Sequence, residues 1–202
     1  IKIAIEINSN NYGAYNNLGV AYQELKNFEQ AIEYFKKAIE LNNEYAEAYN
    51  NLGNSFNKLG KLEEAIKCFN KAIRIKNNFH EAYNNLCGTF IDLYKYDEAL
   101  IAINKALELN PIYPDALFNK GRLFEINKKF KDAFNQYCAA LKINNNHIES
   151  LKHRSFIFEE SNEFENALID LNKILSISPD ADGVLGNILS IKMKTCSWDN
   201  SY

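Results

Sequence analysis

The feature that most constrains this sequence is an internal repeat with a period of 34 residues. The segment Ala-Tyr-Asn-Asn-Leu at residues 14–18 recurs at residues 48–52 and 82–86 without insertion. A second segment, which begins at Glu29, has counterparts at the same spacing along the rest of the chain. Self-similarity with a period of about 20 to 50 residues is typical of repeat proteins, in which each unit is one supersecondary element that packs on its neighbours.

The repeat divides the chain into five complete units and two partial ones. The complete units are predicted at residues 12–45, 46–79, 80–113 and 114–147, with a degenerate one at 148–181. Residues 1–11 are expected to be the second-helix remnant of a preceding unit, and residues 182–202 the start of a sixth, truncated unit. Because both ends fall within a unit, we expect a piece of a longer protein whose uncovered ends either associate end to end or fray.

Each unit carries two stripes of apolar residues at helical spacing. In the first unit the stripes consist of Tyr15, Leu18 and Tyr22, followed by Ala31, Phe35 and Ala38. This spacing predicts two amphipathic helices per unit. A single helix pair cannot bury its own apolar faces, so neighbouring pairs must cover them, and an all-α solenoid is the expected fold class. Gly19 and Gly53 are expected to lie against Ala31 and Ala65 and to let the two helices approach closely.

The composition is that of a globular protein without a nucleic-acid or membrane partner. The chain is 47% hydrophobic and 24% charged, and its net charge of -3 offers no basic surface to a phosphate backbone. No apolar run reaches the roughly 18 residues that a membrane span needs. The cysteines form no Cys-x-x-Cys pair and are expected to be reduced thiols of a cytoplasmic, intracellular protein. They are Cys68, Cys87, Cys138 and Cys196.

No catalytic motif stands out in the sequence. There is no Ser/His/Asp set, no glycine-rich phosphate loop and no dinucleotide fingerprint. The histidines, His80, His147 and His153, have no second ligand at metal-binding spacing on one helix face. The chain is therefore predicted to be non-catalytic, with no cofactor and no metal site.

The repeat pattern resembles that of the tetratricopeptide repeat (TPR) family over essentially the whole chain. The residues of the first unit that match are Tyr15, Leu18, Gly19, Tyr22, Ala31, Phe35 and Ala38. Pro111 and Pro179 close the third and fifth units as in the family, whereas Arg154 and Ser155 replace the usual Leu-Gly in the fifth. The resemblance implies a right-handed superhelix of antiparallel helix pairs, with the first helices lining a concave face.

The sixth residue of each unit lies off the packing stripe and is expected to point into that concave groove. These residues are Asn17, Asn51, Asn85, Asn119, His153 and Asn187; together they are called the amide column below. An asparagine side chain offers two donors and an acceptor, which suits the main chain of a peptide. The column predicts a site for an extended protein or peptide segment. The alternative is that these amides hydrogen-bond between neighbouring helices.

The column also resembles that of O-linked N-acetylglucosamine transferases and SPINDLY-like proteins. In that family the TPR arm holds an acceptor protein for a C-terminal glycosyltransferase domain. Residues 196–198 resemble the segment that follows the last repeat there, although Ser197 stands where an acidic residue is usual. Trp198 is alternatively the hydrophobic residue that opens the sixth unit's second helix. The resemblance implies a substrate-recruiting arm whose sugar-nucleotide site lies beyond Tyr202.

Two other protein-binding functions remain open. One is a stand-alone TPR adaptor for protein complex assembly. The other is a two-carboxylate clamp for acidic chaperone tails, which needs basic residues beside the amides. Lys152 and Arg154 flank His153 and are the candidates for that role.

Overall fold

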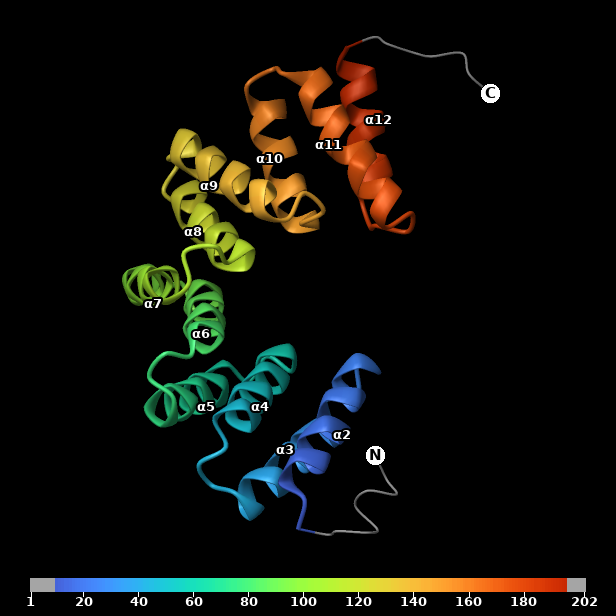
Figure 1. Cartoon of the computed structure of the whole chain (residues 1–202). Helices are drawn as coiled ribbons and strands as arrows, with labels where there is room; N and C mark the ends of the chain where they lie inside the picture. The colour runs from blue at the N-terminus through green and yellow to red at the C-terminus, as the bar shows by residue number, and fades with distance from the viewer. Residues whose placement is uncertain (1–9, 196–202) are drawn as a thin grey trace. The chain divides into compact units, whose positions relative to one another are not determined.

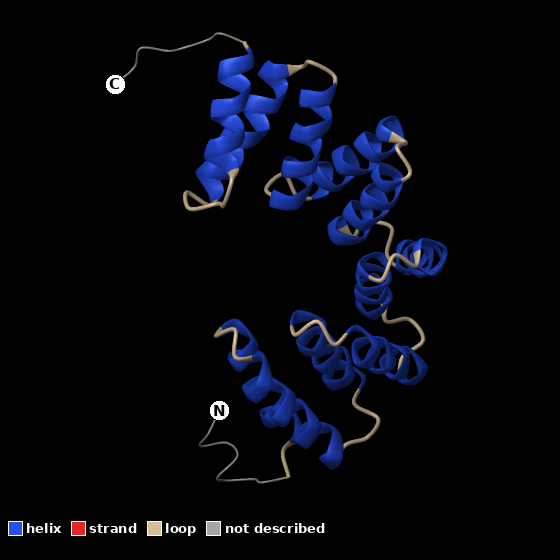
Figure 2. Cartoon of the chain, turned by 180° about the vertical axis from the view of Figure 1, so that it is seen from behind, coloured by secondary structure: helices blue, strands red, loops and turns tan. Residues whose placement is uncertain are grey.

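The computed structural model describes residues 10–195, which contain eleven α-helices and no strand (Figures 1 and 2). The helices are α2 (Tyr12–Glu24), α3 (Phe28–Leu41), α4 (Ala46–Lys58), α5 (Leu62–Ile75), α6 (His80–Asp92), α7 (Tyr96–Leu109), α8 (Pro114–Ile126), α9 (Phe130–Ile143), α10 (Ile148–Glu160), α11 (Phe164–Ile177) and α12 (Val184–Lys194). The predicted all-α class is confirmed. The predicted remnant at residues 1–11 lies almost wholly outside the described range, as do Ser197 and Trp198.

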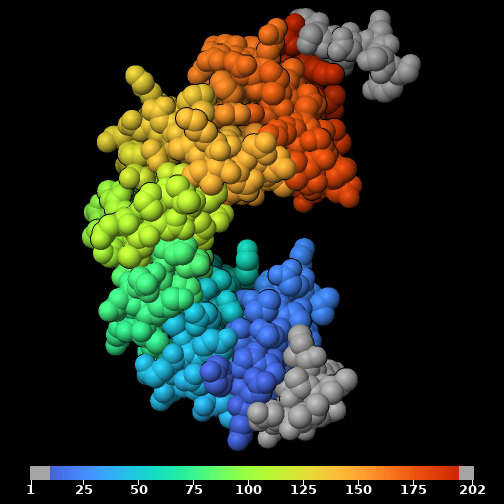
Figure 3. Space-filling model, in the orientation of Figure 1, coloured from blue at the N-terminus to red at the C-terminus, as the bar shows by residue number. Residues whose placement is uncertain are grey.

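The helices form antiparallel pairs that stack in two compact bodies. The N-terminal body, residues 1–111, holds α2 to α7, and the C-terminal body, residues 112–202, holds α8 to α12. Within each body the second helix of one pair packs on the first helix of the next pair, as α3 does on α4 and α9 on α10. The space-filling view shows successive pairs of a body in direct contact (Figure 3). Each body is therefore a short α-solenoid with a core that continues from pair to pair.

A left-handed residue reverses the chain between the two helices of every pair. These residues recur every 34 positions and are Lys26, Gly60, Tyr94, Lys128 and Asn162, with φ between 57° and 72°. Only Gly60 adopts this conformation without a steric cost from Cβ. The other pairs make the same turn with larger residues at this position. The packing of the two helices, and not the backbone preference of the turn residue, therefore determines the turn.

In three of the pairs a glycine of the first helix packs against an aromatic ring of the second. The glycine–ring pairs are Gly19 with Phe35, Gly53 with Phe69 and Gly121 with Tyr137. A Cβ atom at these glycines would lie only 2.4–2.6 Å from the Cε1 atom of the ring. The prediction that Gly19 and Gly53 pack against Ala31 and Ala65 is therefore corrected, because the nearest side chains are the rings.

The pairs without this glycine also lack the ring. At the corresponding positions, the α6/α7 pair has Cys87 and Ile103, and the α10/α11 pair has Ser155 and Leu171. All four side chains are buried. A larger residue on the first helix is thus matched by a smaller one on the second, which conserves the volume of the core.

The α10/α11 pair contains an ion pair in its core. The Arg154 guanidinium donates from Nε and Nη2 to the two carboxylate oxygens of Asp170, at 2.8 and 2.7 Å. The Asp170 side chain is 3% exposed and that of Arg154 is 24% exposed. The hydrogen bond to Asp170 raises the pKa of Arg154, so its charge is held firmly. Arg154 occupies the repeat position that is leucine in the first two units, at Leu18 and Leu52. An arginine is tolerated at this position because Asp170 forms charge-assisted hydrogen bonds with it.

Candidate binding surface

In the N-terminal body the amide column is joined to a second row of asparagines. Asn51 Nδ2 donates to Oδ1 of Asn16 at 3.0 Å, and Asn85 Nδ2 donates to Oδ1 of Asn50 at 3.0 Å. Asn16 and Asn50 each precede a column residue in the sequence and are buried, whereas Asn51 and Asn85 are half-buried. The column amides therefore bridge from one helix pair to the preceding one.

A further set of hydrogen bonds runs along the same first helices. Gln23 Nε2 donates to the backbone oxygen of Asn51 at 3.0 Å and to Ser55 Oγ at 2.8 Å. One pair further on, Asn57 Nδ2 donates to Thr89 Oγ1 at 2.8 Å. Ser55 and Thr89 are fully buried and also donate to backbone oxygens one turn earlier. This polar row was missed by sequence reasoning, although its residues recur 34 positions apart, and it helps to hold α2, α4 and α6 in register.

The column residues differ in their surroundings. Asn17, at the start of the column, is exposed, and Asn119 on α8 is half-buried. In the C-terminal body His153 is half-buried on α10 and Asn187 is exposed on α12. His153 and Asn187 line one cavity of about 300 Å³, together with Lys152. These two column residues therefore border the same cavity of the C-terminal body.

In the C-terminal body an aromatic pair replaces the pair of amides. Phe118 stands in the register of Asn16 and Asn50, and the His153 ring meets it edge-on with the centroids 5.1 Å apart. The two positions thus change together, from an amide pair to an aromatic pair. His153, which has no amide partner here, turns to the carboxylate of Glu125 at 3.0 Å.

Glu125 is the centre of a small hydrogen-bonded cluster. Its Oε2 atom accepts from the Tyr137 hydroxyl at 2.7 Å and lies 3.0 Å from His153 Nδ1. Burial opposes the charge of Glu125, but the hydrogen bonds from His153 and Tyr137 outweigh burial, so the pKa of this carboxyl lies below its usual value. Burial and the bond to Glu125 raise the pKa of Tyr137, which keeps its hydroxyl as a donor. Sequence reasoning missed this cluster.

The other two histidines lie at the starts of first helices. The His147 side chain caps α10 by accepting from the backbone N–H of Ser150 at 3.2 Å, and its Nε2 lies 3.1 Å from Asp115. His80 opens α6 and contacts Asn110 and Glu81. Among residues 10–195 no three His, Cys, Asp or Glu side chains gather as metal ligands.

Three of the cysteines lie in the described part of the chain as free thiols, at positions 68, 87 and 138. Burial raises the pKa of Cys68 to about 11, so this side chain is an uncharged thiol at neutral pH. Cys196 lies outside the described residues. None of the helices α2 to α12 combines the length and hydropathy that a bilayer-spanning helix needs.

The basic residues expected beside His153 do not act together. Lys152 is exposed and lines the cavity that contains His153. Arg154 instead turns to the buried Asp170 carboxylate, which neutralises its charge. One of the two cations that a two-carboxylate clamp would use is therefore committed to the core.

Comparison with protein families shows where the chain resembles known sequences. Two family profiles, both described as tetratricopeptide repeat, match residues 12–78 and 89–147. A comparison with curated proteins gives no match.

Solved structures resemble the chain over most of its length. YrrB, described as a TPR protein with an unusual peptide-binding site, is 25% identical with a TM-score of 0.60, and the match covers 92% of this chain and 96% of YrrB. The thermophilic TPR protein TTC0263 of Thermus thermophilus is 19% identical with a TM-score of 0.80, over 90% of this chain and 99% of that one. The APC/C hetero-tetramer Cut9–Hcn1 is 18% identical with a TM-score of 0.89, over 96% of this chain and 39% of that one. The last two likenesses show the fold alone.

Proposed function

Because the chain belongs to the tetratricopeptide repeat family, we propose that it is a protein-binding scaffold whose amide column holds an extended partner chain. The TPR is a non-catalytic scaffold, and this chain is not an enzyme. A relative of the same fold, YrrB, is described as having a peptide-binding site. The observation that carries the proposal is the row of half-buried amides at Asn51 and Asn85, each of which uses one N–H for the neighbouring helix.

The unused atoms of these amides suit the main chain of a peptide. Each asparagine amide has two N–H donors and an acceptor oxygen. Asn51 and Asn85 give one N–H to Asn16 and Asn50, and within residues 10–195 their side chains make no other hydrogen bond. The second N–H and the Oδ1 atom can therefore bind a backbone C=O and N–H of an extended segment. Because the inter-helix bond also fixes the amide orientation, little side-chain entropy is lost on binding.

The paired rows allow the binding role to be separated from the packing role. Asn85→Ala removes a column amide, whereas Asn50→Ala removes only the buried acceptor of the same hydrogen bond. Both variants are expected to lose about 1–2 kcal/mol of unfolding free energy. Asn85→Ala is expected to weaken binding by tenfold or more. Asn50→Ala is expected to weaken it much less, because the column amide stays in place and loses only the bond that fixes its orientation. The measurement is fluorescence polarisation of a labelled peptide, selected on the wild-type chain from a random twelve-residue phage library.

Equal binding by wild type and Asn85→Ala would contradict the proposal. In that case the amides would serve only to join neighbouring helices, which is the alternative that the sequence left open. Asn51→Ala is tested as a separate variant. A peptide that binds through its side chains alone would be insensitive to both Asn85→Ala and Asn51→Ala.

We further propose that this scaffold is the substrate-recruiting arm of an O-GlcNAc-transferase-like glycosyltransferase. The amide column supports a recruiting role, because amides that bind the peptide main chain would hold acceptor proteins of many different sequences. The alternative is a stand-alone adaptor for complex assembly. A glycosyltransferase region encoded directly after Tyr202 would support the arm, and its absence would support the adaptor.

End-to-end self-association is the remaining proposal about partners. One face of α12 carries Leu185, Leu189 and Met193, all exposed and spaced four residues apart. Such a stripe favours association with a second copy. Sedimentation velocity at increasing concentration is expected to show dimers of the wild-type chain and monomers of Leu189→Lys. A wild-type chain that stays monomeric at the highest concentration would exclude self-association.

A further inference from the structure

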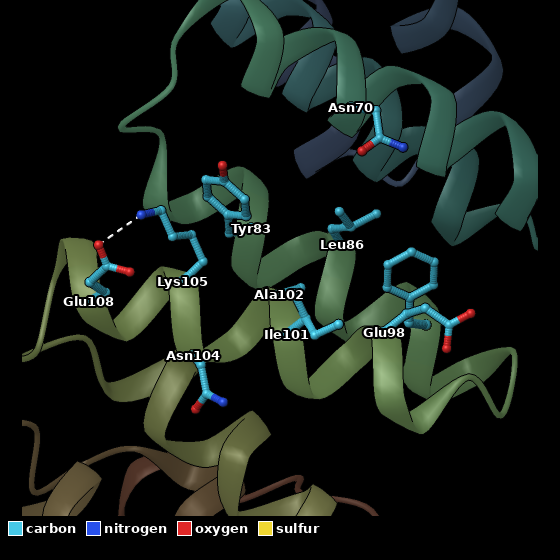
Figure 4. Close-up of a pocket in the computed structure, with 10 residues that line it drawn as sticks. Asn70, Tyr83, Leu86, Glu98, Ile101, Ala102, Asn104, Lys105 and Glu108 are labelled. Carbon is cyan, nitrogen blue, oxygen red and sulfur yellow. Dashed lines mark hydrogen bonds and ion pairs between the residues drawn. The ribbon is translucent and has the colours of Figure 1, made fainter.

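The N-terminal body carries an apolar groove that the amide column does not use. It has a volume of about 710 Å³ and lies between α6 and α7, with Asn70 of α5 at its edge (Figure 4). Leu86 and Phe90 of α6 and Ile101 and Ala102 of α7 supply its apolar lining. No residue of the amide column lines it.

The groove exists because a small residue stands where other pairs have a larger one. Ala102 occupies the register of Tyr34 in the α2/α3 pair. There the Tyr34 ring stacks on Tyr22 with the centroids 5.2 Å apart, which fills the space between the helices. Phe90 stands in the register of Tyr22 and lines the groove together with Ala102, whose methyl group is much smaller than the Tyr34 ring. The missing ring leaves the hollow.

The rim of the groove is apolar at a position that is polar in three other pairs. Ile101 is 72% exposed. Its counterparts in the α2/α3, α4/α5 and α8/α9 pairs are Glu33, Lys67 and Asn135. These polar residues are exposed although a following helix packs on each of those pairs, so this position faces solvent and not the next pair. Ile101 is therefore not an element of the stacking interface.

The charge at the rim is negative. Glu98 is exposed, lies one turn before Ile101 on α7, and has no ionic or hydrogen-bonding partner within the described residues. Lys105, two turns further along, is bonded to Glu108 at 2.7 Å, so its charge is balanced within the chain (Figure 4). An occupant of this groove would find an apolar hollow with one unpaired carboxylate beside it.

We propose that this groove binds a protein segment that places a bulky apolar side chain over Ala102 and a lysine or arginine beside Glu98. A leucine or phenylalanine would bury its surface against Leu86, Phe90 and Ile101, which is the kind of anchor that dominates peptide affinity. The basic residue complements Glu98 and selects among apolar segments. This gives the scaffold a second binding surface, independent of the amide column.

The test is a subtractive selection that uses the whole 202-residue chain. A random twelve-residue phage library is first depleted on Ile101→Lys and then selected on the wild type. Lysine is the residue of the α4/α5 pair at this position, and the side chain is exposed, so Ile101→Lys is expected to unfold at the wild-type temperature. The surviving peptides are expected to carry a bulky apolar residue next to lysine or arginine.

Affinities of these peptides for matched variants decide the outcome. Ile101→Lys and Ala102→Gln, a residue taken from the α8/α9 pair, are expected to weaken binding tenfold or more, and Glu98→Gln threefold or more. Ile169→Lys, at the same position of the α10/α11 pair, is expected to leave binding unchanged. The proposal is overturned if no peptide survives the depletion, if Ile169→Lys weakens binding as much as Ile101→Lys, or if Glu98→Gln has no effect.

Discussion

Asp170→Ala is expected to destabilise the chain by about 3–5 kcal/mol, which is a large part of the stability of a domain of this size. The substitution removes both hydrogen bonds that the Arg154 guanidinium makes to the carboxylate, and it leaves a cavity in place of that carboxylate. The Asp170 side chain is only 3% exposed, so water cannot replace it without rearrangement of the core. Because stability in a solenoid is local, α10 to α12 are expected to lose hydrogen-exchange protection first.

The α6/α7 pair supplies the rescuing variant. It has Leu86 and Ala102 at the positions of Arg154 and Asp170. Arg154→Leu with Asp170→Ala is therefore expected to recover part of the loss, since it removes the unpaired charge but still leaves a smaller side chain at position 170. Chemical denaturation followed by circular dichroism measures both variants. A double variant no more stable than Asp170→Ala would show that the pair acts in some other way.

Lys71→Ala provides the control for the ion-pair prediction. Lys71 lies 3.5 Å from Glu44 in a pair that is largely exposed on both sides. Surface pairs of this kind contribute about 0–1 kcal/mol. A loss similar to that of Asp170→Ala would mean that burial is not the reason for the large effect.

Gly53→Cys is expected to cost at least about 1–3 kcal/mol, because the new Cβ would lie 2.6 Å from Cε1 of Phe69. Phe69 is fully buried and cannot swing away. Gly53→Cys with Phe69→Ile transplants the pair that Cys87 and Ile103 form, and this double variant is expected to be more stable than Gly53→Cys alone. Phe69→Ile alone is expected to be destabilised by the cavity it leaves.

Gly88→Ala is the matched control for this clash. Gly88 also lies inside a first helix, α6, but a Cβ there would meet nothing within 4 Å. Alanine is a better helix former than glycine by about 1 kcal/mol, so Gly88→Ala is expected to raise the melting temperature slightly. Thermal unfolding of the four variants measures the contrast. Additive effects of Gly53→Cys and Phe69→Ile would show that the two sites do not share one packing constraint.

Much of the fold could be predicted from the amino-acid sequence because it depends on period. A spacing of 34 residues with apolar positions at i, i+3 and i+7 leaves helix pairs as the only regular structure, and the pairs must stack to bury their stripes. The same register identified the amide positions Asn51 and Asn85 without any knowledge of contacts. Register determines which face of a helix a residue occupies.

The position of a residue in the repeat does not determine which side chains it contacts. Those contacts are set by the tertiary structure. In the sequence Arg154 is only a departure from the repeat pattern, whereas in the structure its guanidinium is bonded to Asp170. His153 is only a column residue in the sequence, whereas in the structure it lies 3.0 Å from Glu125. Gly53 was expected against an alanine because both are small, yet it accommodates the ring of Phe69. These partners depend on side-chain rotamers and on the close packing of neighbouring pairs, which a linear pattern of residue types does not encode.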